Sequence, residues 1–402
     1  MSHSATESKA TISAAPAYQP PSPVLDAWDP LAPSDDDVDM FAAAQKREIR
    51  NILKSYTGYY DLFSEMIQNA LDAVEKRSAE NVQGYQPEIA INIDIQSNSV
   101  TVTDNGCSMN LQQFKRFLKP NFSFKDGPAT RGSKGVGATY LAFGFNYLRL
   151  ATKPTTGTTY SGVLKDGRTW LDDGKGIIPR PTVEPQSDTS PLDHFDRGTS
   201  ITLKLVGDNI RPKSLQYFIA KDAQQWICLL RAHTPLGGLY LCSETPPKIK
   251  ITVKVVADKG EETIGKMEAP RYLYPHEVLG KTADLREFLK DQANRAAKNQ
   301  DLAKIPPKFT NLNGMWGEWT GTEILSGATP LNPAWSAGEK ELMQELDPRI
   351  YVFMCYSTDL WDDYNDNVLK LRKGTRICAA GSSRQQSICR KEIRSLFRSP
   401  IT

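Results

Sequence analysis

Three polar residues recur at helical spacing in the segment from Asp61 to Arg77. Glu65, Asn69 and Asp72 are separated by four and three residues, so on an α-helix they lie on one face, within about 60° of one another. Their carboxylate and amide oxygens offer acceptors to a ligand, although a lone glutamate on a helix is more often simply solvated. Asparagine inside a helix costs some stability, so the presence of Asn69 at this position suggests a role other than helix formation.

A second candidate is Asp104, at the end of a segment in which apolar and polar residues alternate. Period-two alternation places Val100, Val102 and Asp104 on one face of a strand, so the carboxylate points towards the core before Asn105-Gly106 turns the chain. An inward carboxylate needs a hydrogen-bond donor. The amino group of a bound purine is one such donor, and an Asx-type turn is the alternative.

A third candidate is the glycine-rich segment TRGSKGVG. Gly132, Gly135 and Gly137 permit close backbone approach, and they lead into a predicted helix whose first N–H groups favour an anion. Arg131 and Lys134 add positive charge. The spacing matches neither a Walker A loop nor a Rossmann fingerprint, and a glycine-rich loop alone is weak support for a phosphate site.

Apolar periodicity predicts the elements that must hold these groups. Residues at three- and four-residue spacing predict a helix over 61–77 with one apolar face: Phe63, Met66, Ile67, Ala70 and Val74. Alternation over 89–95 and 100–102 around a turn-prone segment predicts a β-hairpin. A helix is expected from near residue 138, and strands over 147–151, 158–164 and 200–206. Thr199 precedes the last strand, where its hydroxyl could face a ligand or simply begin the strand.

Composition excludes several classes of protein. The chain has 402 residues with 49 Lys+Arg against 47 Asp+Glu, so its net charge of +2 gives no global argument for nucleic-acid or membrane binding. No apolar run approaches the roughly 18 residues that a bilayer span needs. The N-terminal segment lacks an apolar signal region. Six single cysteines without a CxxC pair weigh against structural zinc and a disulfide scaffold. We expect a reduced, cytoplasmic protein with no membrane association.

The organisation along the chain predicts a tail and two domains. Residues 1–39 are rich in proline and acidic residues and are expected to be disordered. A helix is predicted from Met40 to Lys54, and a domain boundary near 207–212 separates 40–207 from 208–402. The second part is expected to hold a helix over 213–232, a strand over 249–256, an insertion over about 280–345 and a buried strand over 349–357. The last 33 residues form a basic end.

The order of the motifs is more informative than any one of them. ExxxNAxDA on a helix, a strand ending in DxGxxM, GxxGxG leading into a helix and GT on a strand together resemble the Bergerat ATP-binding fold of the GHKL superfamily. This superfamily comprises gyrase, the 90-kDa heat-shock chaperones, histidine kinases and the MutL mismatch-repair proteins. The resemblance covers about residues 41–207. It implies an α+β protein, with a Bergerat α/β sandwich followed by a transducer-like α/β domain.

The resemblance also implies a role for each motif residue. Glu65 would activate the attacking water and Asn69 would coordinate Mg²⁺ on the triphosphate of ATP. Asp104 would accept from the adenine amine. The remaining nucleotide contacts would come from Asp72, Gly106, Met109, Arg131, Gly132, Lys134, Gly135, Val136, Gly137 and Thr199. Ser108 replaces the family's second glycine after the strand, which affects the expected pocket geometry and ATP affinity. Residues 110–131 would form a lid.

The branch of the superfamily determines the expected function. Glu65 favours hydrolysis over kinase chemistry, because histidine kinases generally have asparagine there, and none of the four histidines, His3, His194, His233 and His276, lies in a helix pair before the domain. The length is too short for the middle and dimerisation domains of a full 90-kDa-type chaperone. The layout resembles MutL, topoisomerase-type and MORC-type ATPases and bacterial anti-phage operon proteins.

This layout implies ATP hydrolysis that drives nucleotide-dependent homodimerisation of a clamp. The clamp would act on DNA or in a defence complex with operon-encoded partners. A chaperone-like ATPase and a nucleotide-binding subunit with little turnover are the alternatives. The segment 40–55 and the tail are expected to be free to cross to a second subunit. In such relatives a second-domain lysine reaches the γ-phosphate, and Lys370, Arg372 and Lys373 are the local candidates.

Overall fold

The computed structural model describes residues 38–120, 136–238, 240, 247–267, 270–327 and 335–355. The chain divides into two units, 1–45 and 46–402. Of the first unit, the described residues 38–45 form the first turns of helix α1, Val38–Lys54. The helix therefore begins two residues before the predicted start at Met40. Residues 1–37 of the predicted tail lie outside the described residues.

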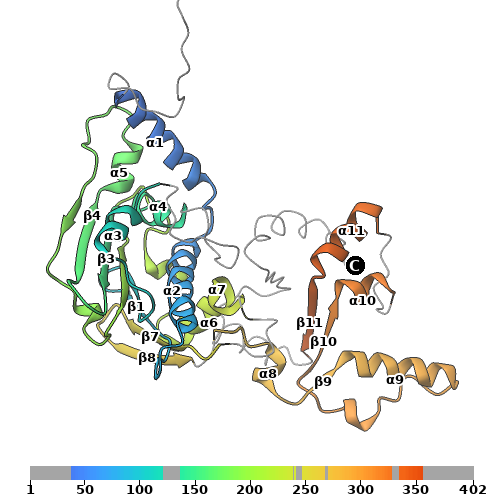
Figure 1. Ribbon diagram of the computed structural model, residues 1–402. Coiled ribbons are helices and arrows are strands. Elements are labelled where there is room, and N and C mark those ends of the chain that lie inside the picture. The colour runs from blue at the N-terminus through green and yellow to red at the C-terminus, as the bar shows by residue number, and fades with distance from the viewer. Residues whose placement is uncertain are drawn as a thin grey trace, which may run out of the picture. The chain divides into compact units, whose positions relative to one another are not determined.

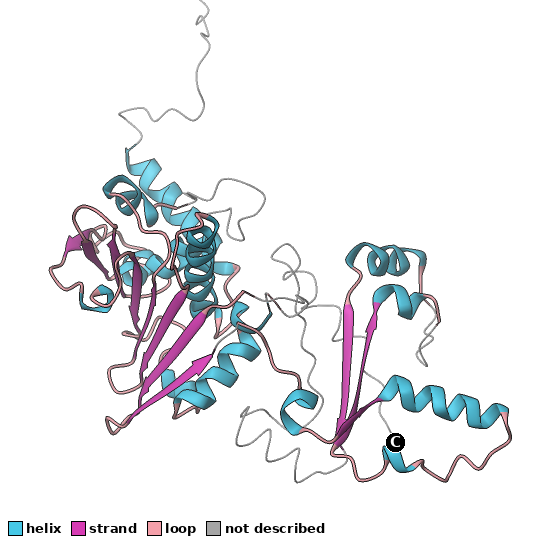
Figure 2. Ribbon diagram, turned by 60° about the horizontal axis from the view of Figure 1, so that its bottom comes forward, coloured by secondary structure: helices cyan, strands magenta, loops and turns pink. Residues whose placement is uncertain are grey.

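An eight-stranded sheet forms the centre of the second unit, with the strand order β5-β4-β3-β6-β2-β1-β7-β8 (Figures 1 and 2). All neighbouring strands are antiparallel except β1 and β7, which are parallel. The strands are β1 (Glu88–Asp94), β2 (Ser99–Asp104), β3 (Tyr147–Lys153), β4 (Tyr160–Lys165), β5 (Val183–Pro185), β6 (Gly198–Lys204), β7 (Lys250–Val256) and β8 (Glu262–Met267).

Helices cover one face of this sheet (Figures 1 and 2). On β1 the isoleucines at alternate positions are buried while Asn92 on the opposite side is exposed, as expected where one face is covered. The helices of this part are α2 (Asp61–Ala79), α3 (Leu111–Phe117), α4 (Val136–Phe143), α5 (Gly167–Asp172), α6 (Ala223–His233) and α7 (Pro235–Gly238). Short 3₁₀ turns cover 190–192 and 215–218.

The predicted helix and hairpin are confirmed. Every residue of the predicted apolar face between 61 and 77 is buried in the central core, together with Leu62 and Leu71. The hairpin pairs Ile91 with Val102 and Ile93 with Val100, so the alternating apolar residues of both strands share the covered face. Local periodicity was sufficient because α2 and this hairpin bury their apolar residues directly against each other.

The second half of α1 is anchored to its own domain. Ile49 is buried in a cluster with Trp170 and Leu171, and the Arg50 guanidinium donates to the Leu171 carbonyl at 2.6 Å. The Lys46 ammonium donates to the Asp173 carbonyl at 3.0 Å. The expectation that 40–55 is free to cross to a second subunit is therefore wrong for residues 46–54.

The predicted domain boundary at 207/208 also differs from the structure. Strands β7 and β8 extend the same sheet, and β7 pairs with β1 along its whole length, with Ile251 opposite Ile89. On α6, Trp226 and Leu230 are fully buried in the same core as α2. The apolar residues of β7 and α6 complete this core, so the first domain continues to Met267. A 3₁₀ turn and α6 replace the single helix predicted over 213–232.

A separate three-stranded sheet, with the order β11-β10-β9, follows. Two of its strands come from the segment predicted as an insertion over about 280–345, so part of that segment belongs to this sheet. The predicted buried strand over 349–357 is described only to Cys355 and is partly exposed, since Met354 is 43% exposed. The elements are α8 (Pro275–Leu279), β9 (Thr282–Asp284), α9 (Leu285–Ala297), β10 (Gly314–Thr320), α10 (Gly321–Leu325), α11 (Ala337–Leu346) and β11 (Arg349–Cys355).

Among the residues that the structure describes, no helix combines the length and the apolarity needed to cross a membrane.

Candidate nucleotide-binding site

Helix α2 presents the three polar residues predicted to act together. It is continuous from Asp61 to Ala79, so Glu65, Asn69 and Asp72 share one face as their spacing predicts. All three are partly buried rather than fully solvated. The apolar face beside them packs into the core and fixes the orientation of the helix. The polar stripe is therefore held by the fold at the margin of the core.

The Glu65 carboxylate is confined on two sides. The Tyr56 hydroxyl donates a hydrogen bond to Glu65 Oε1 at 3.0 Å. Glu65 Oε2 lies against Gly137, where a Cβ atom would collide with it. Gly137 belongs to the first turn of α4, which directly follows the glycine-rich segment. Two motifs that are 72 positions apart in sequence thus meet at this carboxylate.

The Asp104 carboxylate is buried at the end of β2, with a residue exposure of 5%. Register places it between Ile89 of β1 and Thr199 of β6. Its Oδ1 atom accepts a hydrogen bond from the Gly106 N–H at 2.9 Å. The inward orientation predicted from the alternation is confirmed, and the Asx-type turn that we considered as an alternative is present as well.

Burial raises the pKa of Asp104 from 3.8 to about 8. Hydrogen bonds from the backbone of Gly106 and Thr199 and the positive charge of Arg77 act in the opposite direction, but they do not offset the loss of solvation. A ligand that donates a hydrogen bond to this group would favour its ionised form. Asp104 is thus a buried group whose charge state would respond to a ligand that donates a hydrogen bond to it.

A buried threonine, Thr152 of β3, connects the turn after Asp104 with β6. Its hydroxyl accepts from the Met109 N–H at 2.9 Å and lies 3.2 Å from the Gly198 carbonyl, to which it donates. The Thr199 hydroxyl is 3.4 Å from the Cys107 carbonyl. Met109 packs against the central core. The structure therefore brings Asp104, Met109 and Thr199 together, although no sequence pattern singles out Thr152.

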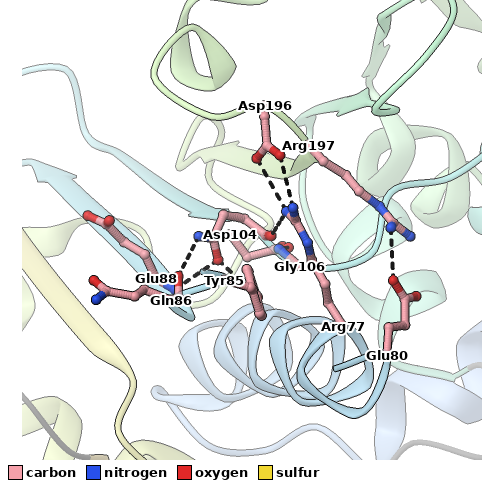
Figure 3. Close-up of polar contacts among 10 residues, drawn as sticks. Arg77, Glu80, Tyr85, Gln86, Glu88, Asp104, Gly106, Asp196 and Arg197 are labelled. Atoms are coloured by element: carbon pink, nitrogen blue, oxygen red, sulfur yellow. Dashed lines mark hydrogen bonds and ion pairs between the residues drawn. The ribbon is translucent and has the colours of Figure 1, made fainter. Parts of the chain in front are cut away.

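An arginine that the sequence analysis missed supports this turn (Figure 3). Arg77, 5% exposed, donates to the Asn105 carbonyl at 2.6 Å and forms an ion pair with Asp196 at 2.9 Å. Its guanidinium also lies over the Tyr85 ring, 4.4 Å from the centroid. The available signal was its position three residues after Val74, where a charged residue continues the apolar stripe of α2.

The hydroxyl and amide groups around Asn105 complete this support. The Tyr85 hydroxyl and the Glu88 N–H both donate to Asn105 Oδ1, at 3.1 and 2.8 Å, and Asn105 Nδ2 donates to the Gln86 carbonyl at 2.8 Å. The turn that follows Asp104 is thus fixed from both sides, by Arg77 and by the segment before β1.

Part of the predicted phosphate site lies outside the described residues: Arg131, Gly132, Lys134 and Gly135. Val136 and Gly137 form the first turn of α4.

Asn69 carries an amide oxygen, a ligand type that suits Mg²⁺. Within the described part of the chain no group of three or more His, Cys, Asp or Glu could hold a metal.

Comparison with known proteins gives a limited similarity. A scan against models of known protein families found no match. The chaperone protein HtpG of Desulfotalea psychrophila (strain LSv54 / DSM 12343) is 26% identical over 189 residues, which are 42% of this chain and 28% of that protein. HtpG of Nitrosomonas eutropha (strain DSM 101675 / C91 / Nm57) is 26% identical over 185 residues, 42% of this chain and 27% of that protein.

The chain thus matches less than a third of the length of these curated relatives. The similarity is consistent with an ATPase-type domain of the GHKL superfamily, which includes the 90-kDa heat-shock chaperones. It does not extend to features specific to the MutL, MORC or topoisomerase branches.

Two glycines of the site allow a matched prediction. A Cβ atom on Gly137 would meet the flexible end of Glu65, whereas one on Gly106 would meet the backbone of Ala73 and Val74. Gly137→Ala should therefore keep the thermal stability of the wild type while it displaces the Glu65 carboxylate, and Gly106→Ala should lower thermal stability. Thermal unfolding of both variants tests this. A loss of stability in Gly137→Ala as large as that in Gly106→Ala would contradict the contrast between a flexible and a rigid neighbour.

Proposed function

We propose that this chain binds ATP with Mg²⁺ and hydrolyses it. The observation that supports the proposal most strongly is the position of Glu65 against Gly137, because it sets a candidate general base beside the helix start that follows the glycine-rich segment. Asp104 supplies a buried acceptor for the adenine amine, with Thr199 beside it in register. Asn69, one turn beyond Glu65, would hold the cation on the phosphates.

The chemistry assigned to these residues is a single in-line transfer to water. Glu65 would accept a proton from the water that attacks the γ-phosphate. Bound Mg²⁺ would supply charge neutralisation on the phosphate oxygens. The backbone N–H groups at the start of α4 would face the same oxygens, which a helix N-terminus favours.

We further propose that ATP binding drives formation of a homodimeric clamp that acts on nucleic acid, or in a defence complex with operon-encoded partners. The sequence supports this through the basic end, which has nine Lys+Arg and one Glu in its last 33 residues. These residues, including Lys370, Arg372 and Lys373, lie outside the described residues. A chaperone-like activity on protein clients is the second candidate, and the similarity to HtpG favours it.

Two measurements distinguish the clamp from the chaperone-like function: the oligomeric state of the protein and the stimulation of its ATPase by DNA or by a client protein. We expect light scattering to show a monomer or weak dimer without nucleotide and a tighter dimer with a non-hydrolysable ATP analogue. Removal of residues 1–37, which leaves the anchored part of α1 intact, should weaken this dimer.

If the clamp binds DNA, the logarithm of the binding constant should fall with the logarithm of the salt concentration, with a slope of about −0.9 for each phosphate contact. Stimulation of the ATPase by DNA should therefore weaken steeply as salt is added. Neutralising Arg390, Lys391, Arg394 and Arg398 should flatten that slope. Stimulation by an unfolded client protein instead of DNA would favour the chaperone-like function. An unchanged mass with and without the analogue would refute the clamp.

A further inference from the structure

We infer that Tyr56 is a positioning residue for Glu65: its hydroxyl holds the carboxylate in the orientation that water activation requires. This inference rests on the proposed ATPase function and adds a residue outside all the motifs that suggested it. Tyr56 lies in the segment between α1 and α2, nine residues before Glu65, and its hydroxyl donates to Glu65 Oε1 at 3.0 Å. A glutamate side chain has three rotatable bonds, so a base on a helix surface needs such a contact to remain aimed.

The ring of Tyr56 is itself fixed by α4. It stacks on Tyr140 with ring centroids 4.0 Å apart and an angle of 5° between the planes. Tyr140 is buried and also contacts Phe145 edge-on at 5.5 Å. The hydroxyl of Tyr56 is therefore presented by a ring that cannot turn away without breaking this stack.

The segment that carries Tyr56 is also anchored to the start of α2. The Gly58 N–H donates to Asp61 Oδ2 at 2.6 Å, and the Tyr56 N–H donates to the Leu53 carbonyl at 3.1 Å. Both ends of the segment are thus connected to helices. The distance from Tyr56 to Glu65 is set by the backbone on each side.

Both oxygens of the Glu65 carboxylate are held by contacts that depend on the same helix, α4. Tyr56 contacts Oε1 and rests on Tyr140, while Gly137 lies against Oε2, and both Tyr140 and Gly137 belong to α4. A shift of α4, for example when phosphates bind at its start, would move both contacts together. Tyr56 thereby makes the position of the base depend on the helix that follows the glycine-rich segment.

The protonation states suit this role. Burial and the neighbouring Glu65 raise the pKa of Tyr56, so the phenol remains a donor throughout the working range. Asp61 of α2 and Tyr140 of α4 also raise the pKa of Tyr56, and Arg211 and Arg168 act on Tyr140. A donor to a carboxylate stabilises its charged form, the form that can accept a proton from water.

The test compares Tyr56→Phe with Tyr59→Phe in the full chain. Tyr59 is in the same segment, but its ring stacks on Tyr217 at 4.1 Å, so its variant controls for loss of a hydroxyl. We expect Tyr56→Phe to bind ATP as the wild type does, to lose about 10- to 100-fold in kcat, and to reach half its maximal kcat at a higher pH. Tyr59→Phe should change neither kcat nor the pH profile.

Further variants separate this inference from the proposed function. In a Glu65→Gln background, Tyr56→Phe should cause no additional loss of kcat, because the two residues act through one carboxylate. Tyr140→Leu removes the ring on which Tyr56 stacks but leaves the Tyr56 hydroxyl in the protein. This variant should also lower kcat, and it replaces Tyr56→Phe as the test if Tyr56→Phe is poorly folded. Inactive Glu65→Gln together with wild-type kcat and pH profile in Tyr56→Phe would overturn the role of Tyr56 alone. Full turnover in Glu65→Gln would instead overturn the assignment of the base.

Discussion

Glu65→Gln should abolish ATP turnover while leaving ATP binding intact. Glutamine keeps the length and shape of the side chain, and its amide can still lie between the Tyr56 hydroxyl and Gly137. It cannot accept the proton of the attacking water, and loss of a general base typically costs about 10²- to 10⁴-fold in rate. Steady-state phosphate release and calorimetric ATP titration of the same preparation would measure both properties.

Asn69 provides the contrast for this variant. Its place one turn beyond Glu65 suits a ligand of the cation rather than a base, so Asn69→Ala should lose Mg²⁺-dependent ATP binding as well as turnover. Equal loss of binding in both variants would show that the two residues do not divide these tasks. Retained turnover in Glu65→Gln would place the base elsewhere in the protein.

The parts of the site that sequence reasoning predicted depend on local periodicity. The helical spacing of Glu65, Asn69 and Asp72 and the inward orientation of Asp104 follow from repeats of 3.6 and 2 residues. Each repeat is enforced by apolar residues on the same element, which the structure buries in one core. A local pattern suffices wherever one element carries both the functional group and the apolar face that orients it.

The features that were missed depend on pairing between distant segments. The parallel pairing of β7 with β1 joins residues about 160 positions apart, and the sequence of neither strand indicates which strand it pairs with. The contacts of Arg77 with Asp196 and of Tyr56 with Tyr140 also join separate elements, and neither tyrosine stands out by spacing. The domain boundary was misplaced for the same reason, because a drop in periodicity near 207 marks a loop and not the end of the sheet.

Substitution of Asp104 is expected to have the second large effect. Because its carboxyl group is buried, the effect on the free energy of unfolding depends on pH. The folded protein holds a proton on Asp104 up to about pH 8, whereas the unfolded chain releases it near its ordinary pKa of 3.8. Between these two values the folded state binds more protons, so this group makes the free energy of unfolding fall as pH rises. Asp104→Asn removes the titration, and ligand-free Asp104→Asn should gain stability relative to the wild type between about pH 5 and pH 8.

The same variant should lose ATP. Asp104 Oδ1 already accepts from the Gly106 N–H, and an adenine amine would add a second donor. In its ionised form, which a donor ligand would favour, the Asp104 carboxylate has one oxygen for each donor. An amide has one oxygen, so in Asp104→Asn one donor must face the amide NH₂. Loss of a hydrogen bond to a charged group costs about 1.5–3 kcal/mol, or roughly 10- to 100-fold in Kd. Calorimetric titration should show this loss for ATP, and the preference for ATP over GTP should narrow, since the amide NH₂ can donate to the guanine carbonyl. Unchanged ATP affinity in Asp104→Asn, in a protein whose denaturation curves show the expected gain in stability, would separate the buried carboxyl from adenine recognition.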